Sequence, residues 1–184
     1  MAGRSGPWGW HRLDRRWAAR LVELAAVAPG DLVLDVGAGG GVITTQLVRA
    51  GARVVAIELH ERRAALLRDR FAGCPVTVVR ADATDLRLPR RPFKVVANPP
   101  FAATTALLRR LTSPSSRLEQ ASLVLPPWAA LRWAAGRGAG GAAARRAFTC
   151  SLGPCIPAGA FRPPPPQDPR VLVIVRTPTR RSVA

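Results

Sequence analysis

Short apolar runs alternate with helically periodic segments along this chain. Such runs predict buried strands, whereas apolar positions three and four residues apart predict amphipathic helices. The predicted strands span 32–36, 53–58, 76–80, 94–97, 122–125, 148–150 and 171–175. The predicted helices span 14–27, 42–50, 61–71 and 103–111. This alternation predicts the α/β class, with a doubly wound and mostly parallel sheet.

Candidate binding residues gather where the predicted strands end. A glycine-rich segment begins at Asp35, and Glu58, Asp82 and Asn98 end or follow the next strands along the chain. In open α/β sheets, ligands bind in the crevice at the carboxyl ends of the strands. One edge of the sheet is therefore predicted to hold every candidate site.

The first of these segments is the turn Asp35-x-Gly37-x-Gly39-x-Gly41. A dinucleotide-binding fingerprint requires its third glycine at the position that Val42 occupies. The G-x-G-x-G spacing is instead the form seen in S-adenosylmethionine-dependent methyltransferases. Glycines let the backbone approach a ligand closely. The turn therefore indicates S-adenosylmethionine as the cofactor, bound by Asp35 and the glycines.

Two acidic residues extend the predicted cofactor site. Glu58 ends the second strand, where its carboxylate could accept hydrogen bonds from both ribose hydroxyls. Asp82 follows the third strand and could accept a hydrogen bond from the adenine amine of the cofactor, with the Ala83 N–H near the ring. The alternative for either acid is a helix cap or a surface position.

The tetrad Asn98-Pro99-Pro100-Phe101 directly follows an apolar run and indicates the chemistry. The exocyclic amine of adenine is a poor nucleophile because its lone pair is delocalised into the ring. The Asn98 side-chain oxygen and the Pro99 carbonyl could accept its N–H groups and favour a more tetrahedral nitrogen. Phe101 offers a face for base stacking. We therefore predict Asn98, Pro99 and Phe101 as catalytic residues, with Asn98 also near the cofactor; a proline loop that merely ends a strand is the alternative.

Arginine dominates the charge of the chain. Its 184 residues include 28 basic and 11 acidic side chains, which gives a formal charge of +17, and Lys94 is the only lysine. This excess suits a polyanionic partner, although biased codon usage and a solvated surface are alternative explanations. Candidate contacts lie beside the first helix and around a glycine-rich loop at 136–141. The predicted RNA-binding residues are Arg12, Arg16, Arg137, Arg145 and Arg146.

Other chemistries find little support in the sequence. The odd number of cysteines and the lack of a CxxC motif indicate reduced thiols in a cytoplasmic protein. His60-Glu61 begins a zincin-like pattern, but Ala64 stands where the second histidine is required. A zinc deaminase would need a cysteine pair that the sequence lacks. We therefore expect no metal site, and no apolar run of about 18 residues predicts a membrane span.

In this order, the motifs resemble those of the ribosomal RNA adenine N6-methyltransferases, the Erm/KsgA family. The resemblance extends from about residue 9 to 175 and is strongest to the Erm branch, the macrolide–lincosamide–streptogramin B resistance enzymes. It implies a Rossmann-like methyltransferase fold. It also implies methylation of an adenosine in the peptidyl transferase region of 23S rRNA, which blocks macrolide binding. The segments that carry it are 35–44, 55–58, 81–83, 97–101 and 161–166.

The resemblance also implies how the chain is organised. We expect a basic N-terminal arm and helix at 1–28, a catalytic domain at 29–177 and a short basic tail at 178–184, without the C-terminal helical domain of the family. Gly9-Trp10-His11-Arg12 replaces the usual Gln-Asn-Phe-type segment, so no contact is assigned there. We expect a monomer that acts in the cytoplasm on 23S rRNA, either free or in an assembling large subunit.

Two alternative functions stay open from the sequence. DNA adenine and protein glutamine methyltransferases also use an Asn-Pro-Pro-aromatic motif, although the charge of +17 disfavours most protein targets. A non-catalytic RNA-binding assembly factor could retain the same scaffold, and cofactor-dependent turnover would distinguish it. The choice between monomethylation and dimethylation and the target nucleotide also stay open.

Overall fold

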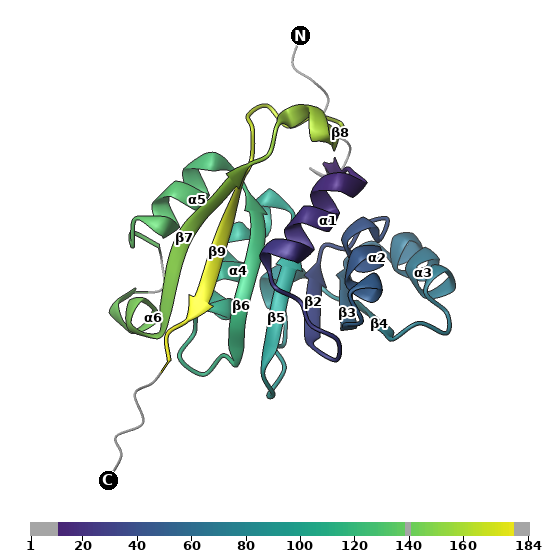
Figure 1. Ribbon diagram of the computed structural model, residues 1–184, viewed down its shortest axis with the longest axis horizontal. Coiled ribbons are helices and arrows are strands. Elements are labelled where there is room, and N and C mark those ends of the chain that lie inside the picture. The colour runs from purple at the N-terminus through teal and green to yellow at the C-terminus, as the bar shows by residue number, and fades with distance from the viewer. Residues whose placement is uncertain (1–10, 139–140, 179–184) are drawn as a thin grey trace.

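A seven-stranded sheet forms the centre of the computed structural model, which describes residues 11–138 and 141–178 (Figure 1). Its strands are β2 (Leu32–Val36), β3 (Arg53–Glu58), β4 (Val76–Arg80), β5 (Phe93–Ala97), β6 (Leu118–Leu125), β7 (Phe148–Cys155) and β9 (Arg170–Arg176). They lie in the order β4-β3-β2-β5-β6-β9-β7. Only β9 runs antiparallel to its neighbours β6 and β7. The predicted α/β class and mostly parallel sheet are therefore confirmed.

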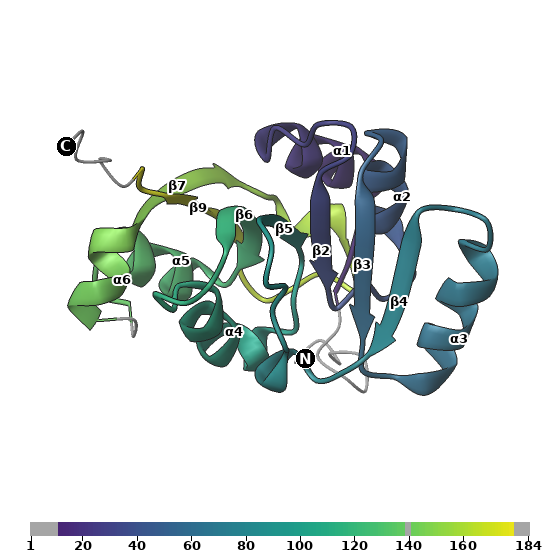
Figure 2. The ribbon, with the colours of Figure 1, turned by 90° about the horizontal axis from the view of Figure 1, so that it is seen from below.

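Helices cover both faces of this sheet. They are α1 (Arg15–Leu24), α2 (Val42–Arg49), α3 (Glu61–Arg70), α4 (Thr104–Leu111), α5 (Pro127–Ala134) and α6 (Gly141–Ala147), with 3₁₀ turns η1 (Ala83–Asp85), η2 (Phe101–Ala103) and η3 (Ala158–Ala160). Figure 2 shows α1 and α2 on one side of the sheet and α4, α5 and α6 on the other. This is the doubly wound arrangement that the alternating pattern predicts.

Alternate residues of the central strands face the two helical layers. Val33 and Val54 pack in one cluster with Leu21 of α1 and Leu47 of α2. The neighbouring strand positions pack in a second cluster with α4 and α5. A strand buried on both faces appears in the sequence as a continuous apolar run, which is why β2 was predictable from its apolar residues alone.

The second half of the chain departs from the sequence prediction. β6 begins at Leu118 rather than at 122, and β7 extends to Cys155 rather than to 150. Helices α5 and α6 were not predicted, and α6 begins at the end of the expected loop at 136–141. A short antiparallel pair, β1 (Arg12–Leu13) and β8 (Phe161–Arg162), was also not predicted. This pair attaches the N-terminal segment to the late part of the chain.

Within the part of the chain that the structure describes, no helix is both long and apolar enough to cross a lipid bilayer.

Candidate active site

A cavity of about 520 Å³ lies at the carboxyl ends of β3, β4 and β5. Its volume is in the range of sites that hold small molecules. The structure brings most of the sequence-predicted residues together in its wall. These are Gly37, Glu58, Asp82, Ala83, Asn98, Pro99 and Phe101.

Glu58 is buried, and its carboxylate is already extensively hydrogen-bonded. One oxygen, Oε2, accepts from the Gly39 N–H at 2.9 Å, while Oε1 accepts from the His60 N–H at 2.8 Å and contacts Arg63 Nη2 at 3.1 Å. A carboxylate offers about four acceptor positions, so little capacity is left for a ligand. A bond to one hydroxyl fits this arrangement, whereas bonds to both ribose hydroxyls would require Arg63 to shift.

The glycine turn fits against the Asn-Pro-Pro segment. Gly37 has a φ of +77°, and a Cβ at this position would lie 2.9 Å from Cδ of Pro100. Gly41 also has a positive φ, and a Cβ there would lie 2.7 Å from the Phe71 ring. Both positions therefore disfavour residues other than glycine, for conformation and for space. Gly39 and Gly41 do not line the main cavity in this structure; they shape the turn, and Gly39 holds Glu58.

Asp35 lies beneath the turn rather than in the wall of the main cavity. It is 1% exposed, and its Oδ2 accepts a hydrogen bond from the Thr44 hydroxyl at 2.6 Å. Burial raises its pKa from 3.8 to about 7, against the effect of the Thr44 hydrogen bonds. This carboxyl group ties the end of β2 to the first turn of α2. The structure therefore gives Asp35 a scaffold position behind the predicted cofactor site.

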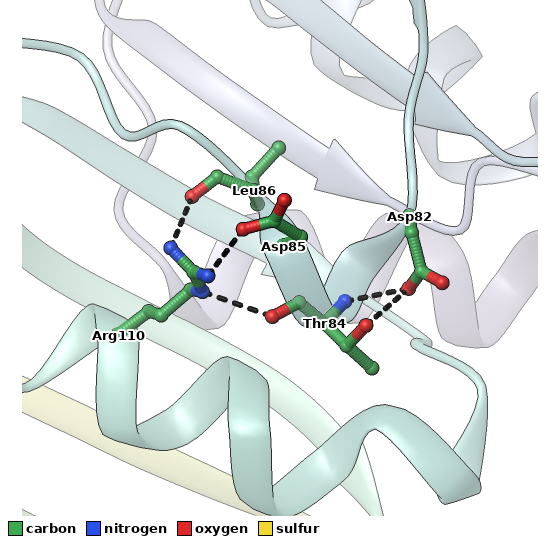
Figure 3. A network of polar contacts seen from close by, with 5 residues as sticks. All are labelled: Asp82, Thr84, Asp85, Leu86 and Arg110. Carbon is green, nitrogen blue, oxygen red and sulfur yellow. Dashed lines mark hydrogen bonds and ion pairs between the residues drawn. The ribbon is translucent and has the colours of Figure 1, made fainter.

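Asp82 caps the short turn η1 and keeps one oxygen for other contacts. Its Oδ1 accepts from both the N–H and the hydroxyl of Thr84, at 2.7 Å and 2.8 Å. These hydrogen bonds lower its pKa, so the side chain is a carboxylate at neutral pH. Both bonds end on the same oxygen, as Figure 3 shows, which leaves Oδ2 for a ligand. The helix-cap alternative and the binding role are therefore compatible.

Arg110 of α4 holds the loop that carries Asp82. Its Nε donates to the Thr84 carbonyl at 2.9 Å, and its Nη1 donates to the Leu86 carbonyl at 3.3 Å. Its Nη2 contacts the Asp85 carboxylate at 2.5 Å (Figure 3). α4 follows the Asn-Pro-Pro-Phe segment through η2, so one guanidinium joins the Asp82 loop to the element behind the predicted catalytic residues.

The side-chain amide of Asn98 has a fixed orientation. Its Nδ2 donates to the His11 backbone carbonyl at 2.7 Å. The His11 ring in turn lies against Phe101, with centroids 5.7 Å apart, and its Nδ1 donates to the Pro163 carbonyl at 2.9 Å. Because the amide nitrogen is taken, Asn98 offers its oxygen as an acceptor beside Pro99 in the cavity wall.

A comparison with protein families shows which family the chain belongs to. The profile of the family described as "Ribosomal RNA adenine dimethylase" matches residues 13–183. The chain belongs to the ribosomal RNA adenine dimethylase family. The resemblance stated from the sequence is therefore confirmed, and with it the Rossmann-like fold of the S-adenosylmethionine-dependent methyltransferases.

Relatives of this dimethylase-family chain come from both branches of the family. It is 32% identical to the rRNA adenine N-6-methyltransferase of Corynebacterium diphtheriae, covering 85% of this chain and 62% of that protein. It is 36% identical to the mycinamicin-resistance protein MyrB of Micromonospora griseorubida, covering 89% and 53%. It is 35% identical to the ribosomal RNA small subunit methyltransferase A of Geobacter sulfurreducens, covering 68% and 48%. The chain thus spans about half to three fifths of the length of these relatives.

A solved structure shares the fold of this family member over most of the chain. The 23S rRNA methyltransferase ErmE superposes with a TM-score of 0.80 at 27% identity, covering 91% of this chain and 70% of that one. The similarity therefore extends well beyond any single motif.

The arginines predicted to bind RNA do not form one cluster in this structure. Arg12 and Arg16 are exposed on β1 and α1, near the edge that carries the cavity. Arg145 and Arg146 are exposed at the end of α6, directly before β7. β7 runs parallel to β6, so its beginning lies at the opposite edge of the sheet. Arg137 is exposed between the two helices α5 and α6.

Sequence reasoning missed several residues that shape the candidate site of this protein. His11 and Arg110 act through contacts with partners 87 and 25 residues away, which no local pattern reveals. Arg63 gives a weak signal, since it lies in the first turn of the helix that follows Glu58. Trp10, the other half of the unusual N-terminal segment, lies outside the described residues. Among the described residues, no group of His, Cys, Asp or Glu is placed to hold a metal ion.

Proposed function

We propose that this chain transfers methyl groups from S-adenosylmethionine to the N6 amine of an adenosine in 23S rRNA, in the peptidyl transferase region. The observation that carries this proposal is the fixed Asn98 amide, whose nitrogen is held by the His11 carbonyl at 2.7 Å. Its oxygen is the acceptor that this side chain then offers, and the carbonyl of Pro99, the next residue in the cavity wall, is the second proposed acceptor for the amino group. Family membership supports an adenine in ribosomal RNA as the bearer of that group.

The residues around the cavity fit the proposed cofactor. Glu58 keeps an acceptor for a ribose hydroxyl, and Asp82 keeps Oδ2 for an adenine amine. Gly37 brings the backbone of the turn close to the Asn-Pro-Pro segment, where a side chain would collide with Pro100. When bound, S-adenosylmethionine supplies a methyl group on a sulfonium, which is a good leaving group.

The protein then contributes mainly position and electrostatics. We propose that the target base is flipped out of the RNA and stacks on Phe101. Asn98 Oδ1 and the Pro99 carbonyl accept its two N–H groups, which orients the amine lone pair toward the methyl group. No general base is required in this scheme, because the proton can leave to water after methylation.

The likeness to MyrB and to ErmE favours the 23S molecule and a role in macrolide-type resistance. The likeness to the Geobacter small-subunit enzyme favours 16S rRNA as the second candidate. We further propose that the chain acts as a monomer in the cytoplasm, on free rRNA or on an assembling large subunit.

Methyl-labelled S-adenosylmethionine tests the proposal with separate substrates. These are protein-free 23S rRNA, protein-free 16S rRNA, duplex DNA and a ribosomal protein mixture. We expect label in N6-methyladenosine or N6,N6-dimethyladenosine from digested 23S rRNA alone. Label from 16S rRNA would establish the second candidate, and label in DNA or protein would contradict both. Cofactor binding without transfer to any substrate, including precursor particles, would favour a non-catalytic assembly factor.

A further inference from the structure

Helix α5 carries two tryptophans in opposite environments. Trp133 is 7% exposed and packs so closely beneath Gly138 that a Cβ there would lie 2.4 Å from the indole. Trp128 is 58% exposed, and Leu131, nearly one turn later, is 49% exposed. Core packing therefore accounts for Trp133 but not for Trp128. Neighbouring exposed apolar side chains of this size indicate an interaction surface.

Trp128 belongs to the edge of the sheet that holds the cavity. β6 lies parallel to β5, with Leu123 opposite Ala97. Asn98 directly follows Ala97, and α5 begins two residues after the end of β6. The first turn of α5, with Trp128, is thus the next element along this edge after the predicted catalytic segment.

The charged residues around α5 indicate what kind of partner this surface would bind. Residues 120–167 contain no Asp or Glu. Of the arginines in this range, Arg132 lies on α5 itself, whereas Arg145 and Arg146 lie at the opposite edge of the sheet and do not belong to this surface. Arg132 is exposed and follows Trp128 by one helical turn. A cationic surface with an exposed indole matches a partner that combines negative charge with flat aromatic faces. Single-stranded RNA has both properties, because its phosphates bind arginine and its bases stack on aromatic rings.

We propose that the exposed face of α5 is an RNA-binding surface, on which Trp128 stacks against an unpaired base near the target adenosine and Arg132 contacts a phosphate. This inference rests on the proposed function for the identity of the RNA. It adds a second aromatic contact, outside the cavity, to the stacking proposed for Phe101.

Direct binding of protein-free 23S rRNA, measured by filter retention without cofactor, tests the surface independently of turnover. We expect Trp128→Ala to weaken binding about 5- to 100-fold, the range that loss of one stacked base produces. Trp128→Phe keeps an aromatic face and should bind within about threefold of the unmodified protein, whereas Trp128→Leu should behave like Trp128→Ala. Leu66→Ala, a matched truncation of a 66% exposed apolar residue on α3, should change nothing.

The salt dependence of binding separates the two contacts. Trp128→Ala should leave the slope of log affinity against log salt unchanged, because stacking releases no counterions. Arg132→Ala should reduce that slope by about 0.7, the contribution of one phosphate contact to a single strand.

The results distinguish this proposal from the proposed function. Weak binding by Trp128→Ala supports the surface even if no methyl transfer is found. Unchanged RNA affinity and unchanged KM in a protein that methylates RNA would overturn the surface and leave the function intact. A dimer that Trp128→Ala converts to monomers, with RNA affinity unchanged, would assign this face to a second copy of the chain and also overturn the proposal.

Discussion

The two halves of the sheet differ in the side chains at their strand ends. In the half formed by β4, β3, β2 and β5, the strand ends carry polar side chains that the backbone holds in place. Glu58 accepts from Gly39, Asp82 from Thr84, and Asn98 donates to His11. In the half formed by β6, β9 and β7, the region 120–167 has no acidic residue. There the edge presents the exposed Trp128.

This difference indicates a division of labour between the halves. Fixed polar groups suit a small cofactor and an amine that must be positioned within a fraction of an ångström. Exposed arginines and an indole suit a large polyanion, for which charge and stacking supply affinity. Changes in the first half should therefore act on cofactor binding, rate and folding, and changes in the second half on RNA affinity.

The largest effect is expected at Asn98. Asn98→Ala removes one of the two proposed acceptors for the target amine, so the rate of methyl transfer should fall by about 10²- to 10³-fold, as for loss of one preorganised polar group. Cofactor binding, followed by calorimetry, should change little. Gln120→Ala is the matched control, since Gln120 also donates its side-chain amide to a backbone carbonyl, that of Leu24 at 3.2 Å. Full activity of Asn98→Ala would contradict the proposed mechanism.

The next effect concerns the pH dependence of stability. The pKa of Asp35 is about 7 in the folded protein and 3.8 in the reference state, so the folded state holds an extra proton between these values. Rising pH removes this proton, and the free energy of unfolding should therefore fall across this window. The stabilisation is fully present below the pKa of Asp35 in the unfolded protein, and it is lost as the pH rises through the pKa of Asp35 in the folded protein.

Urea unfolding of the wild type and of Asp35→Asn checks this prediction. Across the window, wild-type stability should fall by at most about 4 kcal/mol relative to the variant, which carries no titrating group at this position. If the free energies of unfolding of the two proteins changed with pH in parallel, burial would not raise the pKa of Asp35 as described.

Gly37→Ala tests how tightly the glycine turn fits the predicted catalytic segment. The substitution forces a side chain into a φ of +77° and to within 2.9 Å of Pro100. The free energy of unfolding should fall by about 2–4 kcal/mol. Gly40→Ala is the control in the same turn, because a Cβ at Gly40 would meet no atom within 4 Å and its φ is not in the left-handed region. Equal melting temperatures for the two variants would argue against the tight fit.

The smallest effect is expected at Arg110. Arg110→Ala releases the Thr84 and Leu86 carbonyls and the Asp85 carboxylate, which loosens the loop that carries Asp82. Because this network is partly exposed, cofactor affinity should fall only about 3- to 10-fold. Arg109→Ala removes the same charge from an exposed position on the same helix and should leave cofactor affinity unchanged. If calorimetry gave the same cofactor affinity for both variants, Arg110 would have no effect on cofactor binding and this prediction would be wrong.

The difference between the two halves of the sheet also explains which elements the sequence could predict. Strands β2, β3 and β5 are apolar runs followed by a glycine turn or a polar residue, so their place and their shared edge were predictable. α5 is apolar or alanine-rich on most sides and lacks a polar stripe, so helical periodicity did not reveal it. Pro127 at its start and Gly136 shortly after its end were the available signals, and in the structure Gly136 has a positive φ.

The remaining contacts depend on the folded chain. The bond between Asn98 and the His11 carbonyl arises only because β1 pairs with β8 and brings the N-terminal segment over the cavity. The start of β6 was missed because Glu119 and Gln120 interrupt its apolar run. The separation of Arg145 and Arg146 from Arg12 and Arg16 likewise follows from the direction of β7, which composition does not encode.

The most direct test of the division of labour compares Asn98→Ala with Trp128→Ala in methyl transfer to protein-free 23S rRNA, at saturating cofactor. The account predicts that Asn98→Ala lowers kcat with little change in RNA affinity, whereas Trp128→Ala raises KM for RNA with kcat nearly unchanged. Loss of kcat in both variants with equal RNA affinity, or loss of RNA affinity in both with equal kcat, would contradict it.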